Sequence, residues 1–378
     1  MEDLLLSPLD CLGYTSEAAG GLLGNHKRIA ALRQRVIADR HLPLYHFVAP
    51  EKYGWPFDPN GAIYWNGRYH IFYIFQDTSI SHGGHCWGHA STTDLINWKY
   101  HPPALVPREK DPEIGIFSGG AFVNKDGIPT IIYHGLGAGT CIATSEDEEL
   151  IYWTKSPFNP VISEPKEGDD GFGRYGVFDP HAWVEGDKYF AILGNTTKSD
   201  DIRDRAYLFE SSDLVNWEYV GPFYEPRAGW TYEDEDCACP DFFPLGDKFV
   251  LMCISHPRGT RYYTGIMKDE RFIVEEHHRM NWPGGPCFAS ESLLDEKGRR
   301  IFWAWARDQR KMATRSYQSP NKLENQEFKT NPGVMTIPRV ISISSRNVLE
   351  IHPAVEMEKL RHDHRVLKDL HVPEGSSI

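Results

Sequence analysis

The chain has 378 residues, a formal net charge of −13 and no block of basic residues. Because nucleic acid binding requires a positively charged surface, we expect no nucleic acid partner. The 11 Trp, 18 Tyr and 19 Phe suit stacking on sugar rings, and the length allows one large all-β domain.

The cysteines and the apolar runs exclude several classes of protein. Seven scattered cysteines predict no disulfide framework, and Cys237-Ala238-Cys239 has the wrong spacing for a zinc site. His89 and His181 are interpreted as hydrogen-bonded residues of repeated strands, so we expect neither a metal nor a cofactor. Acidic residues precede a very short apolar run at the start, and no run approaches the roughly 20 residues that span a membrane. We therefore expect a cytoplasmic protein with no membrane partner.

Residues 1–44 read as an N-terminal extension with one short amphipathic helix. Ile29, Leu32 and Val36 recur at helical spacing between His26 and Asp39, among Lys and Arg. We expect this helix to brace the main body.

From residue 45 onward the chain repeats itself. A glycine-containing turn followed by an apolar and aromatic strand occurs five times, at Gly67, Gly127, Gly186, Gly246 and Gly298. The steps between these glycines are 60, 59, 60 and 52 residues, a period that fits one four-stranded sheet per repeat. The pattern predicts a five-bladed β-propeller over residues 45–338.

A second motif runs in phase with the first. Segments 91–98 and 211–217 each contain Asp-Leu and end in Asn-Trp, and 144–153 is a weaker version. Each follows an aromatic-rich strand, which predicts an outer hairpin that closes a blade.

Acidic residues stand where three of the inner strands are expected to begin. Asp58 is held in a Pro-Phe-Asp-Pro-Asn-Gly turn with Asn60, Asp179 precedes a proline, and Glu233–Asp236 leads into an apolar strand. Inner strands of a propeller converge, so these carboxyls are expected to meet. Glycoside hydrolysis requires two carboxyl groups across the scissile bond.

Several motifs, in this order, resemble glycoside hydrolase family 32, which comprises the β-fructofuranosidases. They lie at 53–75, 85–98, 116–121, 178–180, 239–243 and 298–305. The resemblance implies a retaining double displacement with Asp58 as nucleophile and Asp179 as transition-state stabiliser. It also implies that Trp87, Phe117, Ser118 and Trp305 line the sugar site.

Departures from the family pattern leave its acid/base position without a carboxyl. Phe57 and Phe178 replace the family's Asn and Arg, Gln76 lies two residues beyond the family's Gln, and Ala238 stands at the position of the acid/base Glu. We favour a relocated acid, either Asp236, which shares a strand face with Ala238, or Glu235 if a bulge intervenes. Glu291 is a further candidate. The alternative is that hydrolysis has been lost.

Residues 339–378 are expected to be a tail, which is too short for the family's C-terminal sandwich of roughly 100 residues. This sandwich would be truncated or absent.

The leading hypothesis is cleavage of β-fructofuranosidic or related furanosidic bonds in a disaccharide or oligosaccharide, with Asn60, Gln76, Phe178 and Glu291 among the substrate-binding residues. An arabinan-type furanosidase and a non-catalytic carbohydrate-binding propeller are the alternatives. The directions of Glu235 and Asp236 discriminate between enzyme and binding module.

Overall fold

The structure is a computed structural model. It describes residues 45–47, 57–77, 84–195, 204–281, 286–307, 333–366, 368–371 and 374–375. The helix expected over residues 26–39 lies outside this part of the chain.

The described residues form five antiparallel sheets, each built from strands that follow one another in the sequence. Blade one contains β1 (Pro59–Trp65), β2 (Arg68–Gln76), β3 (His85–Thr92) and β4 (Lys99–Leu105). Blade two contains β5 (Ile116–Val123), β6 (Pro129–Gly135), β7 (Gly139–Thr144) and β8 (Thr154–Lys155), with β9 (Ile162–Ser163) paired to β7. Blade three contains β10 (Phe178–Glu185), β11 (Lys188–Gly194), β12 (Tyr207–Ser211) and β13 (Trp217–Pro222).

The last two blades have the same construction. Blade four contains β14 (Ala238–Leu245), β15 (Lys248–Ser255), β16 (Gly259–Lys268) and β17 (Arg271–Arg279). Blade five contains β18 (Cys287–Leu294), β19 (Arg300–Arg307), β21 (Arg339–Ile343) and β22 (Leu349–Pro353), with β20 (Gly333–Met335) paired to β19.

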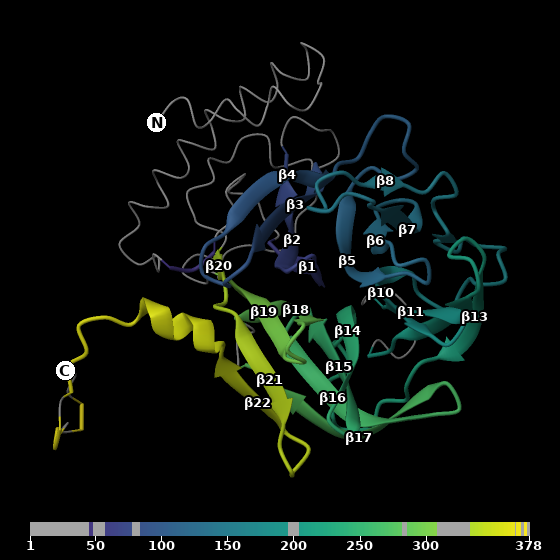
Figure 1. Ribbon diagram of the computed structural model, residues 1–378. Coiled ribbons are helices and arrows are strands. Elements are labelled where there is room, and N and C mark those ends of the chain that lie inside the picture. The colour runs from purple at the N-terminus through teal and green to yellow at the C-terminus, as the bar shows by residue number, and fades with distance from the viewer. Residues whose placement is uncertain are drawn as a thin grey trace, which may run out of the picture.

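The five sheets form a closed ring, with the first strand of each sheet innermost (Figure 1). Around the ring β1 contacts β5, β5 contacts β10, β10 contacts β14, β14 contacts β18, and β18 returns to β1. The all-β, five-bladed propeller predicted from the glycine period is therefore confirmed.

Apolar side chains fill each interface between neighbouring blades. Ile74 and Trp87 of blade one pack with Ile131 and Tyr133 of blade two, for example, and four further clusters occupy the other interfaces. Because the second strand of a blade is covered on both faces, its sequence is a continuous apolar run rather than an alternating one, as in β2.

Every inner strand carries a register shift near its start. The shifts lie at Asn60/Ile63, Ile116/Gly119, Phe178/Pro180, Ala238/Asp241 and Phe288/Glu291. Three non-glycine residues at these places have positive φ, Asp179 at 39°, Cys239 at 44° and Ala289 at 46°. Bulges redirect side chains, and left-handed backbone at such residues stores strain, so this end of the inner strands has the character of a functional site.

The outer hairpins are confirmed at the Asp-Leu motifs. Asp94 lies in the loop between β3 and β4, where its Oδ1 accepts backbone N–H groups of Ile96 at 3.0 Å and Asn97 at 2.8 Å. Asp213 has equivalent bonds to the backbone of Val215 and Asn216 between β12 and β13.

Blade five ends later than the sequence suggested. The propeller was expected to stop at residue 338, but β21 and β22 are the outer strands of the fifth sheet, which therefore reaches Pro353. Beyond it, the described residues form the 3-10 helix η3 (Val355–Leu360), whose Glu356 pairs with Arg299 at 2.9 Å. Within the described part of the chain, no helix has the length and apolar character needed to cross a membrane.

Candidate active site

Asp58 is held at the start of β1 by contacts on both its backbone and its side chain. The Ser118 hydroxyl donates a hydrogen bond to its Oδ2 at 3.1 Å, and the Asn60 amide and the Ile74 N–H both donate to its carbonyl at 3.0 Å. Oδ1 is buried and has no hydrogen-bond partner among the described residues. Burial raises the pKa of Asp58 to about 6. The Ser118 hydrogen bond and the positive charges of His256 and Arg307 oppose this rise.

Asp179 is the second carboxyl of this site, and it is held by the neighbouring blade. The backbone N–H and the thiol of Cys239 both donate to its Oδ2, at 3.2 and 3.4 Å. Its Oδ1 is likewise buried and unpaired among the described residues. Burial and the charge of Asp58 raise the pKa of Asp179 to about 7, while His256 opposes the shift. The two carboxyls are therefore close enough to influence each other's protonation.

His256 is the cationic neighbour of both carboxyls, and the sequence had not singled it out. The Asp236 carboxylate accepts its backbone N–H at 2.9 Å and also contacts its ring Nδ1. The imidazole lies between aromatic rings of two other blades, with ring centroids 6.3 Å from Phe178 and 6.0 Å from Phe288. We call Asp58, Ser118, Asp179, Cys239 and His256 the axial site.

The pairing of His256 with Asp236 follows from the hairpin of blade four. β14 and β15 run antiparallel, and Ala238 lies opposite Ile254. The residue two positions beyond Ile254 therefore lies beside the residue two positions before Ala238. The bulge between Ala238 and Asp241 shifts the register by one residue, so counting outward from the Gly246 turn would place Pro257, not His256, opposite Asp236.

Glu235 points away from the axial site into a cluster of arginines. Its side chain is fully buried and accepts bonds from Arg279 at 2.5 Å and from Arg261 at 3.4 Å. Burial alone would raise the pKa of Glu235, but these partners and the Tyr232 N–H lower it. Arg261 also donates to the Asp236 carbonyl at 2.6 Å, so the cluster fixes the backbone of the 235–236 segment.

Glu291 and Asn60 are buried supports of the β1 turn. The Ala62 N–H donates to Glu291 Oε1 at 3.0 Å, and Asn60 Oδ1 accepts the Gly119 N–H at 3.4 Å. Burial and the charge of Asp241 raise the pKa of Glu291. Both residues are almost fully enclosed by protein, so in this structure they shape the Asp58 turn from within.

The expected aromatic residues divide into two groups. Trp87 and Trp305 are completely buried, with the Trp87 indole donating to the Phe117 carbonyl at 2.8 Å and Trp305 packing on Phe288. These two indoles therefore pack beneath Phe117 and Phe288 inside the protein and are not exposed to a substrate. Phe117 and Phe178 are partly exposed, and their rings lie 6.1 and 5.0 Å from that of His134.

Gln76 lies at the end of β2, where its amide is 3.3 Å from Nε2 of His85. The ring of His85 in turn packs on Phe117, with centroids 4.5 Å apart. Gln76 is thus connected to the aromatic edge of the site.

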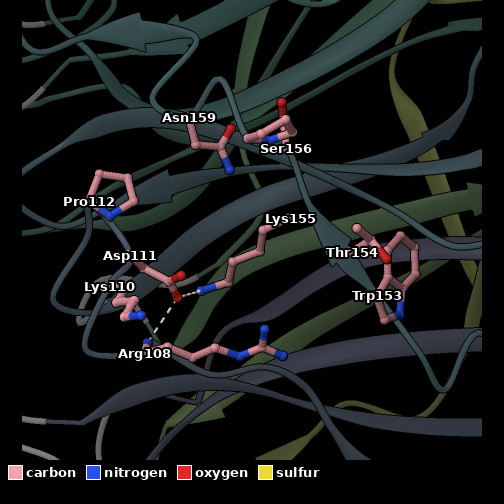
Figure 2. Close-up of a pocket in the computed structure, with 10 residues that line it drawn as sticks. Arg108, Lys110, Asp111, Pro112, Trp153, Thr154, Lys155, Ser156 and Asn159 are labelled. Atoms are coloured by element: carbon pink, nitrogen blue, oxygen red, sulfur yellow. Dashed lines mark hydrogen bonds and ion pairs between the residues drawn. The ribbon is translucent and has the colours of Figure 1, made fainter.

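Two further features of the described residues bear on where a site could lie. The described residues contain no group of three or more His, Cys, Asp or Glu side chains suited to a metal ion. A cavity of about 600 Å³ lies instead on blade two, lined by Arg108, Asp111, Trp153 and Lys155 among others (Figure 2). Lys155 there is already paired with Asp111 at 2.5 Å, and none of the residues expected from the sequence lines this cavity.

Comparison with known sequences places the chain among glycoside hydrolases. Residues 46–353 match the family model described as the glycosyl hydrolases family 32 N-terminal domain. A sucrose-6-phosphate hydrolase of Escherichia coli is 32% identical over 349 residues, which cover 85% of this chain and 66% of that relative. A fructan 6-exohydrolase of Beta vulgaris is 28% identical over 376 residues, 90% of this chain and 59% of the relative. The chain thus spans less than two thirds of the length of these relatives.

Solved structures with the same fold carry related descriptions. A family 32 β-fructofuranosidase of Bombyx mori superposes with a TM-score of 0.68 at 25% identity, covering 92% of this chain and 72% of that one. The fructan 1-exohydrolase IIa of Cichorium intybus has a TM-score of 0.67 at 25% identity, covering 84% and 62%.

Proposed function

Because the chain belongs to glycoside hydrolase family 32, we propose that it is a retaining glycoside hydrolase acting on β-fructofuranosidic or related furanosidic bonds of a disaccharide or oligosaccharide. Sucrose, sucrose 6-phosphate and fructans are the first substrates to consider, because they appear in the names of its relatives. The cytoplasmic location expected from the sequence stays a prediction.

The observation that carries this proposal is the pair of buried carboxyls, each with one oxygen held and one unpaired. Ser118 holds one oxygen of Asp58 and Cys239 holds one oxygen of Asp179. The unpaired oxygens are buried and lack protein partners in the described structure. An unpaired buried carboxylate oxygen is costly, and it suits a nucleophile or a group that binds substrate hydroxyls.

In the proposed reaction, Asp58 attacks the anomeric carbon and forms a covalent glycosyl-enzyme, which water then cleaves. With a pKa of about 6, Asp58 is mostly ionised at neutral pH, as a nucleophile must be. Asp179, with a pKa of about 7, exchanges between its two forms and can either accept or donate a hydrogen bond to a sugar hydroxyl. The roles proposed for Asp58 and Asp179 are those implied by the family resemblance.

Product analysis tests the proposal. Purified protein is incubated with sucrose, sucrose 6-phosphate, inulin, levan and arabinan oligosaccharides, beside an Asp58→Asn control. We expect release of the fructosyl unit, reduced by at least about 10³-fold in the control because the nucleophile is lost. Release of arabinose alone would favour an arabinan-type furanosidase instead.

A second candidate is a carbohydrate-binding propeller without catalysis. The observation that favours it is Ala238, which lacks a carboxyl at the family's acid/base position. Binding of an oligosaccharide with no cleavage of any substrate, unchanged in Asp58→Asn, would support this candidate and overturn the hydrolase.

A further inference from the structure

The proposed reaction requires a group that protonates the leaving oxygen and later takes a proton from water. Glu235 is unsuited because its carboxylate is enclosed and ion-paired with Arg279 and Arg261. Asp236 is fully buried, and both of its oxygens face His256. Glu291 accepts a backbone bond beneath the β1 turn. None of these three carboxyls is placed to reach a glycosidic oxygen.

His256 has the features that the carboxyls lack. Its side chain is 38% exposed, although it lies beside two buried carboxyls. Its Nε2 has no hydrogen-bond partner among the described residues, whereas its Nδ1 contacts Asp236. Phe178 and Phe288 flank the ring, and Phe178 directly precedes Asp179 in the sequence.

We infer that His256 is the general acid and base of this site, with Asp236 as the positioning residue that orients its ring. This inference rests on the hydrolase function proposed above. Since the Asp236 carboxylate can only accept hydrogen bonds when ionised, it keeps a proton on Nδ1 and leaves Nε2 to exchange its proton with the substrate. Asp236 lies two residues before β14, and His256 directly follows β15.

The surrounding charges favour the protonated ring. Burial lowers the pKa of His256, but the hydrogen bond and charge of Asp236 raise it, and the charges of Asp179 and Asp58 add to the rise. The net result is a pKa above its ordinary value, because three carboxylates outweigh the loss of solvation. The imidazolium is therefore populated near neutral pH.

The reaction takes two steps. In the first, an Asp58 oxygen bonds to the anomeric carbon, the glycosidic C–O bond breaks, and the leaving oxygen takes both electrons and the Nε2 proton of His256. In the second, Nε2 removes a proton from water as the water oxygen bonds to the anomeric carbon, and the bond to Asp58 breaks with its electrons returning to the carboxylate. One glycosidic bond and one water are consumed, and the enzyme is regenerated.

The test compares substrates whose leaving groups need or do not need a proton. For His256→Gln we expect kcat/KM to fall by about 10²–10⁴-fold on a sucrose or fructan substrate. On an aryl β-fructofuranoside whose phenolate leaves unaided, the fall should be less than about tenfold, because the first step then needs no acid. Azide, a nucleophile that needs no base, should restore the variant's kcat on the aryl substrate and give a fructosyl azide of retained configuration. His352→Gln, an exposed change on β22, is the matched control and should behave as wild type.

Asp236→Asn provides a second variant that separates positioning from simple damage. It should lower activity by about 10–100-fold and move the alkaline limb of kcat/KM to lower pH, since the carboxylate that raises the His256 pKa is gone. If His256→Gln does not fold, the shift of this alkaline limb tests the role of His256.

Equal losses on both substrates, no loss, or failure of azide to rescue would overturn the role of His256 while leaving the hydrolase intact. A wild-type protein that cleaves none of the glycosides would overturn the hydrolase and this inference together.

Discussion

At the level of single residues, the axial site brings two buried carboxyls together with few neighbouring positive charges. Asp58 and Asp179 are both almost fully buried, and the charge of Asp58 adds to the rise in the pKa of Asp179. The family's Arg next to the second carboxyl is replaced by Phe178, so His256 is the nearby cation that lowers the pKa of both groups. Burying these carboxyls lowers the stability of the fold, a cost that is common where residues are placed for function.

Removing the charge of Asp179 should therefore stabilise the fold. Its folded pKa of about 7 exceeds the ordinary value of 3.8, so the folded protein loses stability as pH rises from about 4 to 7, while the unfolded chain ionises freely. We expect Asp179→Asn to be more stable than wild type by about 1–3 kcal/mol near pH 8, and the gain to vanish near pH 4. Urea unfolding at the two pH values measures the difference.

Asp126→Asn, in the exposed turn between β5 and β6, is the matched control and should change stability little at either pH. A loss of stability in Asp179→Asn at high pH would contradict the pKa shift assigned to this carboxyl.

The sequence predicted that Asp58 and Asp179 would converge, but it could not distinguish the surroundings of Glu235 from those of Asp236. Asp58 and Asp179 stand out because the turn and proline chemistry around them is local. The choice between Glu235 and Asp236 depends on Arg279 and His256, which lie some twenty residues or more away along the chain. Only the tertiary partners distinguish a carboxyl that is locked in an ion pair from one that orients a histidine.

At the scale of elements, the outer hairpins are fixed by one aspartate each. Asp94 Oδ1 accepts two backbone N–H groups, and Leu95 beside it has a φ of 61°. The hydrogen bonds from Asn97, Ile96 and Thr92 lower the pKa of Asp94 to about 2, outweighing its partial burial. This side chain organises a strained turn at the outer edge of blade one.

Replacing Asp94 with Ala should destabilise the protein by about 1–2 kcal/mol, because several backbone donors lose their acceptor. Thr93→Ala, an exposed neighbour without such bonds in the described structure, should change stability by less than about 0.5 kcal/mol. Thermal unfolding of the two variants provides the comparison. Equal stability of Asp94→Ala and wild type would contradict the importance of this turn.

Element boundaries were predictable where a glycine marks the turn. The hairpin between β21 and β22 instead uses Asn347, whose φ is 59°, and it follows a long stretch without the repeat pattern. The sequence therefore predicts a tail where the outer half of blade five lies.

At the scale of the whole molecule, the ring brings together residues from separate blades. Asp58 comes from blade one, Ser118 from blade two, Asp179 from blade three, and Cys239 and His256 from blade four. Blade five closes the ring through β18, and the Tyr69 hydroxyl of blade one donates to Asp295 of blade five at 3.1 Å. The period of the sequence predicted this architecture because each repeat is one sheet, which is a local property repeated five times.

Hydrolysis by the proposed mechanism proceeds with retention through a covalent bond to Asp58. Proton NMR of the first-formed product from a β-fructofuranoside in water containing methanol tests it most directly. We expect methyl β-fructofuranoside, formed by two successive inversions at the anomeric carbon. Methyl α-fructofuranoside would show a single displacement and would contradict the role of Asp58 as nucleophile.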